Sequence, residues 1–248
     1  MRKVAAVLLA TALAVPAGCG ADDESQTLTV LAASSLTGTF TDLATQFEGK
    51  HRGVEVKLVF ESSATLAQLA VEQAPGDVLA TADHRTMQEA EAHGGTSGDA
   101  TRFATNVLVL AVPSDNPARI QSLDDLDRDG VDYLTCVTTA PCGAAADLLL
   151  GRAGISRKPA SAEVDVKAVL GKVESGEADA GLVYRTDAAS SKDAVTALDV
   201  PGAADLPNTY WVATTANARD HALAWEWIDL LTGDDGRAVL TAAGFGTG

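Results

Sequence analysis

Short strand-like runs alternate with helical patterns along most of the chain, and this alternation constrains the fold more than any other feature. The strand-like runs are rich in β-branched and apolar residues, whereas the segments after them carry apolar residues at three- and four-residue spacing. Strands that alternate with helices predict an α/β fold with mostly parallel sheets. Two consecutive units share the order strand, serine pair, helix; they are 27–33, Ser34-Ser35 and 36–49, then 54–60, Ser62-Ser63 and 65–73.

Two continuous apolar runs, 107–112 and 180–184, predict strands that are buried on both faces. Helices that start just after strand ends offer unpaired N–H groups to an anion, although small and polar residues at these positions are also ordinary helix caps. The 248 residues allow one large domain or two modest ones. The remaining expected strands are 77–80, 133–138 and 210–214, and the remaining expected helices are 144–153, 164–175 and 222–231.

The N-terminal segment differs from the rest of the chain. Arg2 and Lys3 precede an apolar stretch at 4–15 that is too short to span a membrane, and small residues follow it, as in a secretory signal peptide. The Ala-Gly-Cys ending resembles the cleavage motif of bacterial lipoproteins, although proline stands where leucine is usual. We therefore expect a signal peptide at 1–18, a lipid on Cys19 and a polar tether at 19–26. The alternative is cleavage nearby without lipidation.

The two remaining cysteines, Cys136 and Cys142, are separated by five residues. In an exported chain such a pair favours a disulfide over a metal site, because the chain has no further cysteine and no histidine lies near the pair. The four histidines are scattered without ligand spacing, so we expect no metal site. Residues 125–130 (DLDRDG) open like a calcium loop, but Cys136 occupies the twelfth position, where glutamate is needed.

Charge and motifs exclude several classes of function. The formal net charge of −16 argues against nucleic-acid binding, which needs a cationic surface. Common nucleotide-binding and serine-hydrolase signatures are missing from the sequence.

Six short motifs carry a family resemblance. In chain order they are 32–37 (AASSLT), 62–68 (SSATLAQ), 74–78 (APGDV), 103–106 (FATN), 141–143 (PCG) and 183–188 (VYRTDA). Together they resemble the periplasmic molybdate-binding proteins of ABC importers, which are type II solute-binding proteins, here in a lipoprotein form. The resemblance extends over nearly all of 27–248.

The resemblance implies a two-lobe periplasmic-binding-protein fold. Each lobe is expected to be a mostly parallel sheet flanked by helices, with two crossover strands as the hinge. Lobe 1 would comprise 27–107 and 213–248, and lobe 2 would comprise 108–212. The implied protein is a monomer without a cofactor or enzymatic activity. It would be anchored through Cys19 to the outer face of the cytoplasmic membrane, and it would deliver molybdate or tungstate to an ABC importer permease.

The resemblance also implies the ligand groups. These are the hydroxyls and amides of Ser35 and Ser63, the amides of Cys142 and Val166, and the phenol of Tyr184, with Ser62 as the alternative to Ser63. The family commonly has alanine where Cys142 stands; an amide donates equally well from cysteine, and a Cys136–Cys142 bridge would hold it in position.

Anion chemistry agrees with this set of groups. Molybdate at neutral pH is a fully deprotonated dianion, so its site should contain hydrogen-bond donors. Phosphate retains a proton and would favour an added carboxylate, which this set lacks. Two alternatives remain open: a binding protein for sulfate or another small oxyanion, and an exported serine hydrolase that uses Ser35 or Ser63. Neither serine lies in a recognisable motif with a histidine and a carboxylate.

Overall fold

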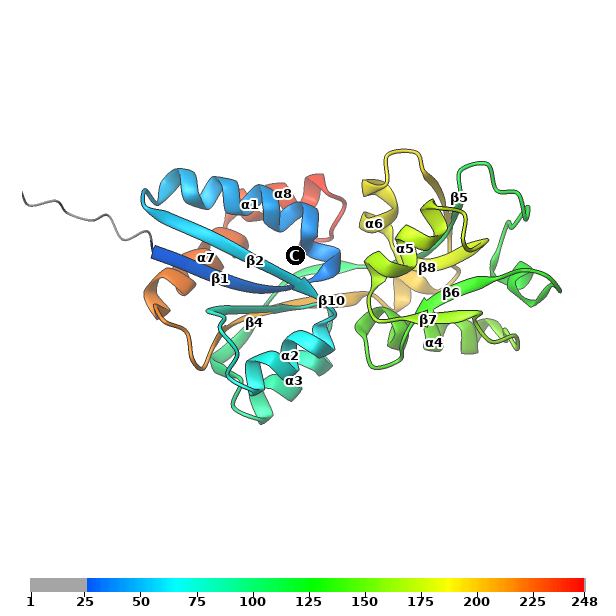
Figure 1. The fold of residues 1–248 in the computed structure, drawn as a ribbon. Coiled ribbons are helices and arrows are strands. Elements are labelled where there is room, and N and C mark those ends of the chain that lie inside the picture. Colours follow the sequence, from blue (N-terminus) through cyan, green and yellow to red (C-terminus); the bar gives the residue numbers. More distant parts are fainter. Residues whose placement is uncertain (1–25, 248) are drawn as a thin grey trace, which may run out of the picture.

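The computed structural model describes residues 26–247 and contains two five-stranded sheets. Figure 1 shows the sheets side by side along the molecule, each with helices against its faces. The expected signal peptide, Cys19 and nearly all of the tether lie outside the described residues. Within 26–247, no helix is both long and apolar enough to cross a bilayer.

The first sheet has the strand order β2-β1-β3-β10-β4. The first three of these strands are parallel to one another, whereas β10 is antiparallel to both of its neighbours. β1 lies between β2 and β3, and helices packed against the sheet bury its last four residues. The strands are β1 (Gln26–Ala33), β2 (Val54–Glu61), β3 (Val78–Thr81), β4 (Thr96–Asn106) and β10 (Asn208–Thr215).

The second sheet has the strand order β7-β6-β8-β5-β9. Here β7, β6 and β8 are parallel, and β5 is antiparallel to β8 and β9. The apolar runs that form β5 and β8 are buried along their whole length. The strands are β5 (Leu108–Pro113), β6 (Tyr133–Cys136), β7 (Ser161–Glu163), β8 (Ala180–Tyr184) and β9 (Val195–Asp199).

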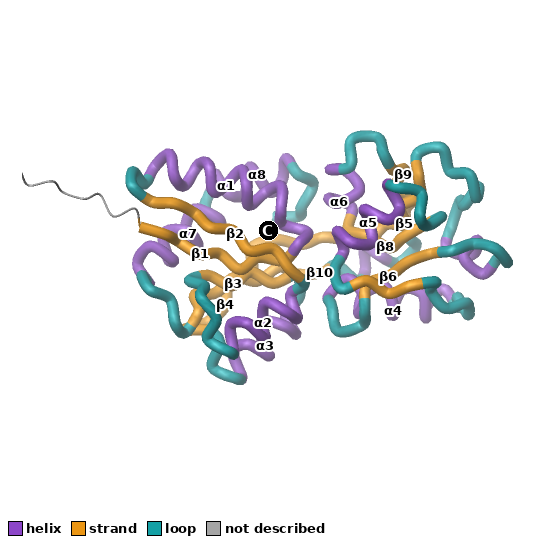
Figure 2. Tube along the Cα trace, in the orientation of Figure 1, coloured by secondary structure: helices purple, strands orange, loops and turns teal. Residues whose placement is uncertain are grey.

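The chain passes between the two sheets twice. It leaves the first sheet where β4 ends at Asn106 and β5 begins at Leu108, and it returns after β9 through a short 3-10 helix to β10 (Figure 2). The strand that follows each crossing is the one that is reversed in its sheet. The α/β prediction with mostly parallel sheets is therefore confirmed. The expected lobe boundary at 213 falls inside β10, and the exact limits of the lobes remain a prediction.

Apolar faces of the helices pack against these sheets. In α1, Phe40 and Phe47 both contact the ring of Trp227 from α7, with ring centroids 5.6 Å apart in each pair. Helices α1, α2, α3, α7 and α8 accompany the first sheet, and α4, α5 and α6 accompany the second. The helices are α1 (Thr37–Lys50), α2 (Ser63–Val71), α3 (His84–Ala92), α4 (Pro141–Ala153), α5 (Val166–Glu174), α6 (Arg185–Ser190), α7 (His221–Thr232) and α8 (Asp234–Ala242).

Candidate functional site

A small cavity of about 10 Å³ lies between elements of the two sheets. Its walls come from strand ends and helix starts of both halves of the molecule. All five residues implied by the family resemblance, together with Ser62, line this one cavity. The lining residues are Ala33, Ser34, Ser35, Ser62, Ser63, Ala82, Ala140, Pro141, Cys142, Asp165, Val166 and Tyr184.

Four helical segments start at the cavity wall: the 3-10 helix at Ser34–Leu36, α2, α4 and α5. The first N–H groups of a helix have no intrahelical partner, and the helix dipole places partial positive charge there. In the part of the chain that the structure describes, no side chain caps the 3-10 helix or α4. Because Pro141 has no N–H, Cys142 provides the first amide of α4. The cavity wall therefore presents neutral N–H donors from several directions.

The two serines at the start of α2 have different local roles. Ser62 is the N-cap, and its Oγ accepts a hydrogen bond from the backbone N–H of Thr65 at 3.2 Å. Ser63 Oγ accepts a hydrogen bond from the N–H of Ala82 at 2.9 Å. Since this bond uses a lone pair of the Ser63 hydroxyl, its proton is left to donate. Ser62 Oγ also lies 2.9 Å from Oγ1 of Thr65, which can take the Ser62 proton, so the geometry favours Ser63 over Ser62 as a donor to a ligand.

Tyr184 carries the least satisfied polar group of the cavity wall. Its side chain is buried, and within 26–247 its hydroxyl has no hydrogen-bond partner. Burial, followed by the nearby Tyr210 and by carboxylates, raises the pKa of this phenol well above its ordinary value, so it keeps its proton. Buried hydroxyls in proteins are almost always hydrogen-bonded. An acceptor in the cavity would satisfy Tyr184.

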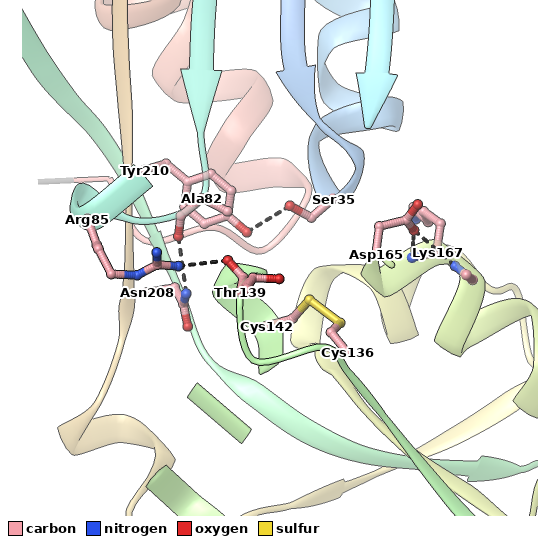
Figure 3. Close-up of a disulfide and its surroundings, with 11 residues drawn as sticks. Ser35, Ala82, Arg85, Cys136, Thr139, Cys142, Asp165, Lys167, Asn208 and Tyr210 are labelled. Carbon is pink, nitrogen blue, oxygen red and sulfur yellow. Dashed lines mark hydrogen bonds between the residues drawn. A yellow bond between two sulfur atoms is a disulfide. The ribbon is translucent and has the colours of Figure 1, made fainter. Parts of the chain in front are cut away.

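The loop between β6 and α4 is closed by the Cys136–Cys142 disulfide, as the sequence predicts. A Cβ added to Gly143 would lie 2.0 Å from the carbonyl oxygen of Val137, so only glycine fits where α4 approaches this loop. The guanidinium of Arg85 on α3 donates to the carbonyl oxygen of Thr139 at 2.8 Å (Figure 3). The loop that presents the Cys142 amide is thus held by a covalent bond and by a contact from the opposite half.

Sequence reasoning missed an acidic residue at the cavity. Asp165 is the one charged residue among those that line it, whereas the sequence interpretation expected a set of groups without a carboxylate. Its Oδ1 accepts hydrogen bonds from the amides of Lys167 and Ala168 at 2.7 and 3.0 Å, as an N-cap does. An aspartate directly before a helical pattern is the signal that would have identified it.

Lys167, the cationic residue nearest to Asp165 in the sequence, forms an ion pair with Asp187. Its Nζ lies 2.8 Å from Oδ1 of Asp187, whose side chain is fully buried. Burial raises the pKa of the Asp187 carboxyl to about 6, and Lys167 opposes this shift. No lysine or arginine is among the lining residues described for the cavity. Across 26–247, histidine, cysteine and acidic side chains form no group of three or more that could hold a metal ion.

A fold of two α/β halves with a cavity of helix starts between them is the architecture of a solute-binding protein. The chain belongs to the family of bacterial extracellular solute-binding proteins, whose family model matches residues 28–246. This family points to a binding protein, in agreement with the sequence interpretation.

Two molybdate-binding proteins are similar to this chain in sequence. The molybdate-binding protein ModA of Mycobacterium tuberculosis is 37% identical over 226 residues, which cover 91% of this chain and 87% of the relative. The molybdate-binding protein ModA of Escherichia coli is 32% identical over 241 residues, which cover 92% of each. The resemblance drawn from the six sequence motifs is therefore confirmed.

Solved structures support the two-lobe fold. The periplasmic molybdate-binding protein of Azotobacter vinelandii aligns with a TM-score of 0.78 at 23% identity and covers 88% of this chain and 98% of its own. The sulfate-binding protein SubI of M. tuberculosis aligns with a TM-score of 0.77 at 17% identity and covers 89% of this chain and 86% of its own. At these identities the likeness concerns the fold alone.

Proposed function

We propose that this protein captures molybdate or tungstate in the cavity between its two halves and delivers the anion to an ABC importer. The observation that carries the proposal is the buried hydroxyl of Tyr184, which has no hydrogen-bond partner among residues 26–247 and belongs to the wall of a cavity that Ser63 also lines. The names of the two relatives agree with this ligand.

The chemistry of the cavity fits a fully deprotonated dianion. The proposed ligand groups are the hydroxyls and amides of Ser35 and Ser63, the amides of Cys142 and Val166, and the phenol of Tyr184. Every one of these groups can donate a hydrogen bond to an oxygen that only accepts. Helix starts add positive potential without a cation, whose charge would have to be desolvated.

Asp165 is compatible with such an anion because its Oδ1 accepts two backbone hydrogen bonds. The charge of this carboxylate repels an anion in the cavity, so the N–H and O–H donors must outweigh that repulsion. Hydrogen bonds to a charged group contribute about 1.5–3 kcal/mol each, and association costs roughly 4–15 kcal/mol. We expect the difference to leave a dissociation constant of about 1 μM or lower, which corresponds to a binding free energy of about −8 kcal/mol.

The remaining expectations form part of the proposal. The signal peptide and Cys19 would place the protein, as a monomer, on the outer face of the cytoplasmic membrane. A lipid on Cys19 is tested by mass spectrometry of the membrane-extracted protein and by release of a Cys19→Ser variant into the medium.

Thermal unfolding with a panel of oxyanions tests the ligand. Molybdate at 100 times its dissociation constant should stabilise the fold by about 2.7 kcal/mol, which is a rise in Tm of roughly 5–10 °C for a chain of this length. Equimolar sulfate and phosphate should have little effect. Equal shifts with all three anions would defeat the assignment to molybdate.

Sulfate is the second candidate ligand, because it is also a fully deprotonated tetrahedral dianion and because SubI, named as a sulfate-binding protein, has a similar fold. Its bonds to oxygen are shorter than those of molybdate, so a cavity built for one anion fits the other less well. Calorimetric titration with both anions decides between them.

A serine hydrolase is the remaining alternative. Ser35 Oγ lies 2.9 Å from a tyrosine hydroxyl, and Ser63 Oγ accepts a backbone N–H, so no histidine is placed to activate either serine in the described residues. A fluorophosphonate probe should label neither serine. Labelling at either one would favour the enzyme.

A further inference from the structure

The hydroxyl of Ser35 contacts a network of buried polar side chains that are not among the proposed ligand groups. Ser35 Oγ lies 2.9 Å from the hydroxyl of Tyr210 on β10, and both side chains are buried (Figure 3). The side chain of Asn106, the last residue of β4, lies close enough to lower the pKa of the Tyr210 phenol. Asn106 ends the sequence motif at 103–106, to which the proposed binding function gives no role.

The direction of donation in this network follows from Asn106. Its Oδ1 accepts the N–H of Val107 at 2.9 Å, and its Nδ2 donates to Oγ1 of Thr186 at 2.8 Å. The Nδ2 group has two protons and cannot accept, so its second proton serves Tyr210. If the Tyr210 oxygen accepts this proton, its own proton is directed to Ser35, although the oxygen positions alone allow either donor.

This arrangement leaves the proton of Ser35 for the cavity. Burial, with the nearby Asp187 as the next cause, raises the pKa of the Tyr210 phenol, so the phenol stays a donor at every physiological pH. A hydroxyl that accepts a hydrogen bond becomes a better donor, because bonds in a chain polarise one another. Ser35 thus resembles Ser63, which accepts from the N–H of Ala82.

We propose that Tyr210 and Asn106 are positioning residues that hold the Ser35 hydroxyl as a hydrogen-bond donor to the anion. The inference rests on the proposed oxyanion function and deepens it. Both residues belong to β4 and β10, the strands at which the chain leaves and re-enters the first sheet. Asn106 also donates to Thr186 of α6, the helix that begins directly after Tyr184. The network therefore links Ser35 in the first half to the segment that carries the Tyr184 phenol in the second half.

A mutant cycle on affinity tests the proposal. Tyr210→Phe keeps the ring that packs against Phe103 and Phe245 and removes only the hydroxyl. We expect its dissociation constant for molybdate, measured by calorimetry, to rise roughly threefold to tenfold. In a Ser35→Ala background the same change should have no further effect, because Tyr210 acts through Ser35. In a Ser63→Ala background, the increases in dissociation constant caused by Tyr210→Phe and by Ser63→Ala should multiply.

Two controls separate positioning from general damage. Tyr133→Phe removes a tyrosine hydroxyl that donates to the carbonyl oxygen of Arg157 away from the cavity, and its affinity should equal that of the wild type. Asn106→Ala removes the donor behind Tyr210 and should show the same dependence on Ser35, which keeps the test available if Tyr210→Phe folds poorly.

Two results would overturn the proposal. One is wild-type affinity in Tyr210→Phe; the other is a full additional loss from Tyr210→Phe in the Ser35→Ala background. Wild-type protein that binds no oxyanion would instead refute the proposed function and, with it, this inference.

Discussion

Tyr184→Phe is the most informative single substitution, because it should move affinity and stability in opposite directions. The change removes one hydroxyl that is buried and has no hydrogen-bond partner within residues 26–247. A hydrogen bond from a neutral donor to an anion contributes about 1.5–3 kcal/mol. We therefore expect the dissociation constant for molybdate to rise about 10- to 150-fold.

The unliganded protein should respond in the other direction. A buried, unpaired hydroxyl carries a desolvation cost of about 1–3 kcal/mol, so its removal should leave the free energy of unfolding equal or higher. Tyr133→Phe is the matched control, because its hydroxyl donates to a backbone carbonyl at 2.6 Å. That variant should lose stability and keep its affinity.

Calorimetric titration with molybdate and urea unfolding without ligand measure the two quantities. Unchanged affinity in Tyr184→Phe would remove this phenol from the site. If unliganded Tyr184→Phe lost as much stability as Tyr133→Phe, the Tyr184 hydroxyl would have a hydrogen-bond partner in the unliganded protein. That result would refute the inference that this hydroxyl is unsatisfied until an anion binds.

Three further predictions concern the surroundings of the cavity. The double variant Cys136→Ser/Cys142→Ser opens a short loop whose closure stabilises the fold by about 2 kcal/mol, so we expect a lower Tm. Because the loop presents the Cys142 amide, we also expect weaker molybdate binding. Unchanged binding would show that the bridge does not position the amide. Arg85→Ala removes the contact with Thr139 across the two halves, so stopped-flow release of molybdate should accelerate about two- to tenfold, and an unaltered release rate would contradict this role. Burial raises the pKa of Asp187 from 3.8 to about 6, so the folded state binds this proton more tightly than the unfolded state. As pH rises from 4 to 6, this group therefore lowers the free energy of unfolding by up to about 3 kcal/mol. The difference in the free energy of unfolding between wild type and Asp187→Asn should change over that pH range, and a difference independent of pH would refute the assignment.

The fold was predictable in outline because apolar periodicity marks elements that face the core. The buried runs of β5 and β8 and the amphipathic pattern of α1 are examples. Helix α3 escaped notice because it is rich in charged and polar residues, and its start depends on Asp83, whose side chain accepts the N–H of Thr86. Strands β7 and β9 are short and largely exposed, so they have no apolar pattern.

The boundaries of α2 show a different difficulty. The sequence places the helix at 65–73, with the serine pair in a turn, whereas the helix spans Ser63–Val71. A cap and the first helical residue have similar preferences for serine, so composition alone does not separate Ser62 from Ser63. Their partners distinguish them: Ser62 contacts both the N–H and Oγ1 of Thr65, whereas Ser63 contacts Ala82, nineteen positions away in the chain.

The candidate site was predictable only where the family resemblance carried it. Four of the five expected residues lie within the six motifs and Val166 was carried over by position; all five line one cavity, and their roles as ligands remain predictions. The partners behind them were not predictable from local patterns. Tyr210 meets Ser35 across 175 positions of sequence, and Asn106 meets Thr186 across 80. Contacts of this kind depend on how the two crossing strands pack.

A crystal structure of the protein with tungstate tests the central claim most directly, because tungsten scatters strongly enough to be located without a model of the ligand. We expect tungsten in the cavity between the two halves, with oxygens of the anion within hydrogen-bond distance of Tyr184 Oη and Ser63 Oγ and with no cation beside it. Tungsten at another place, or a lysine, arginine or metal ion that neutralises the anion in the cavity, would refute the proposed site.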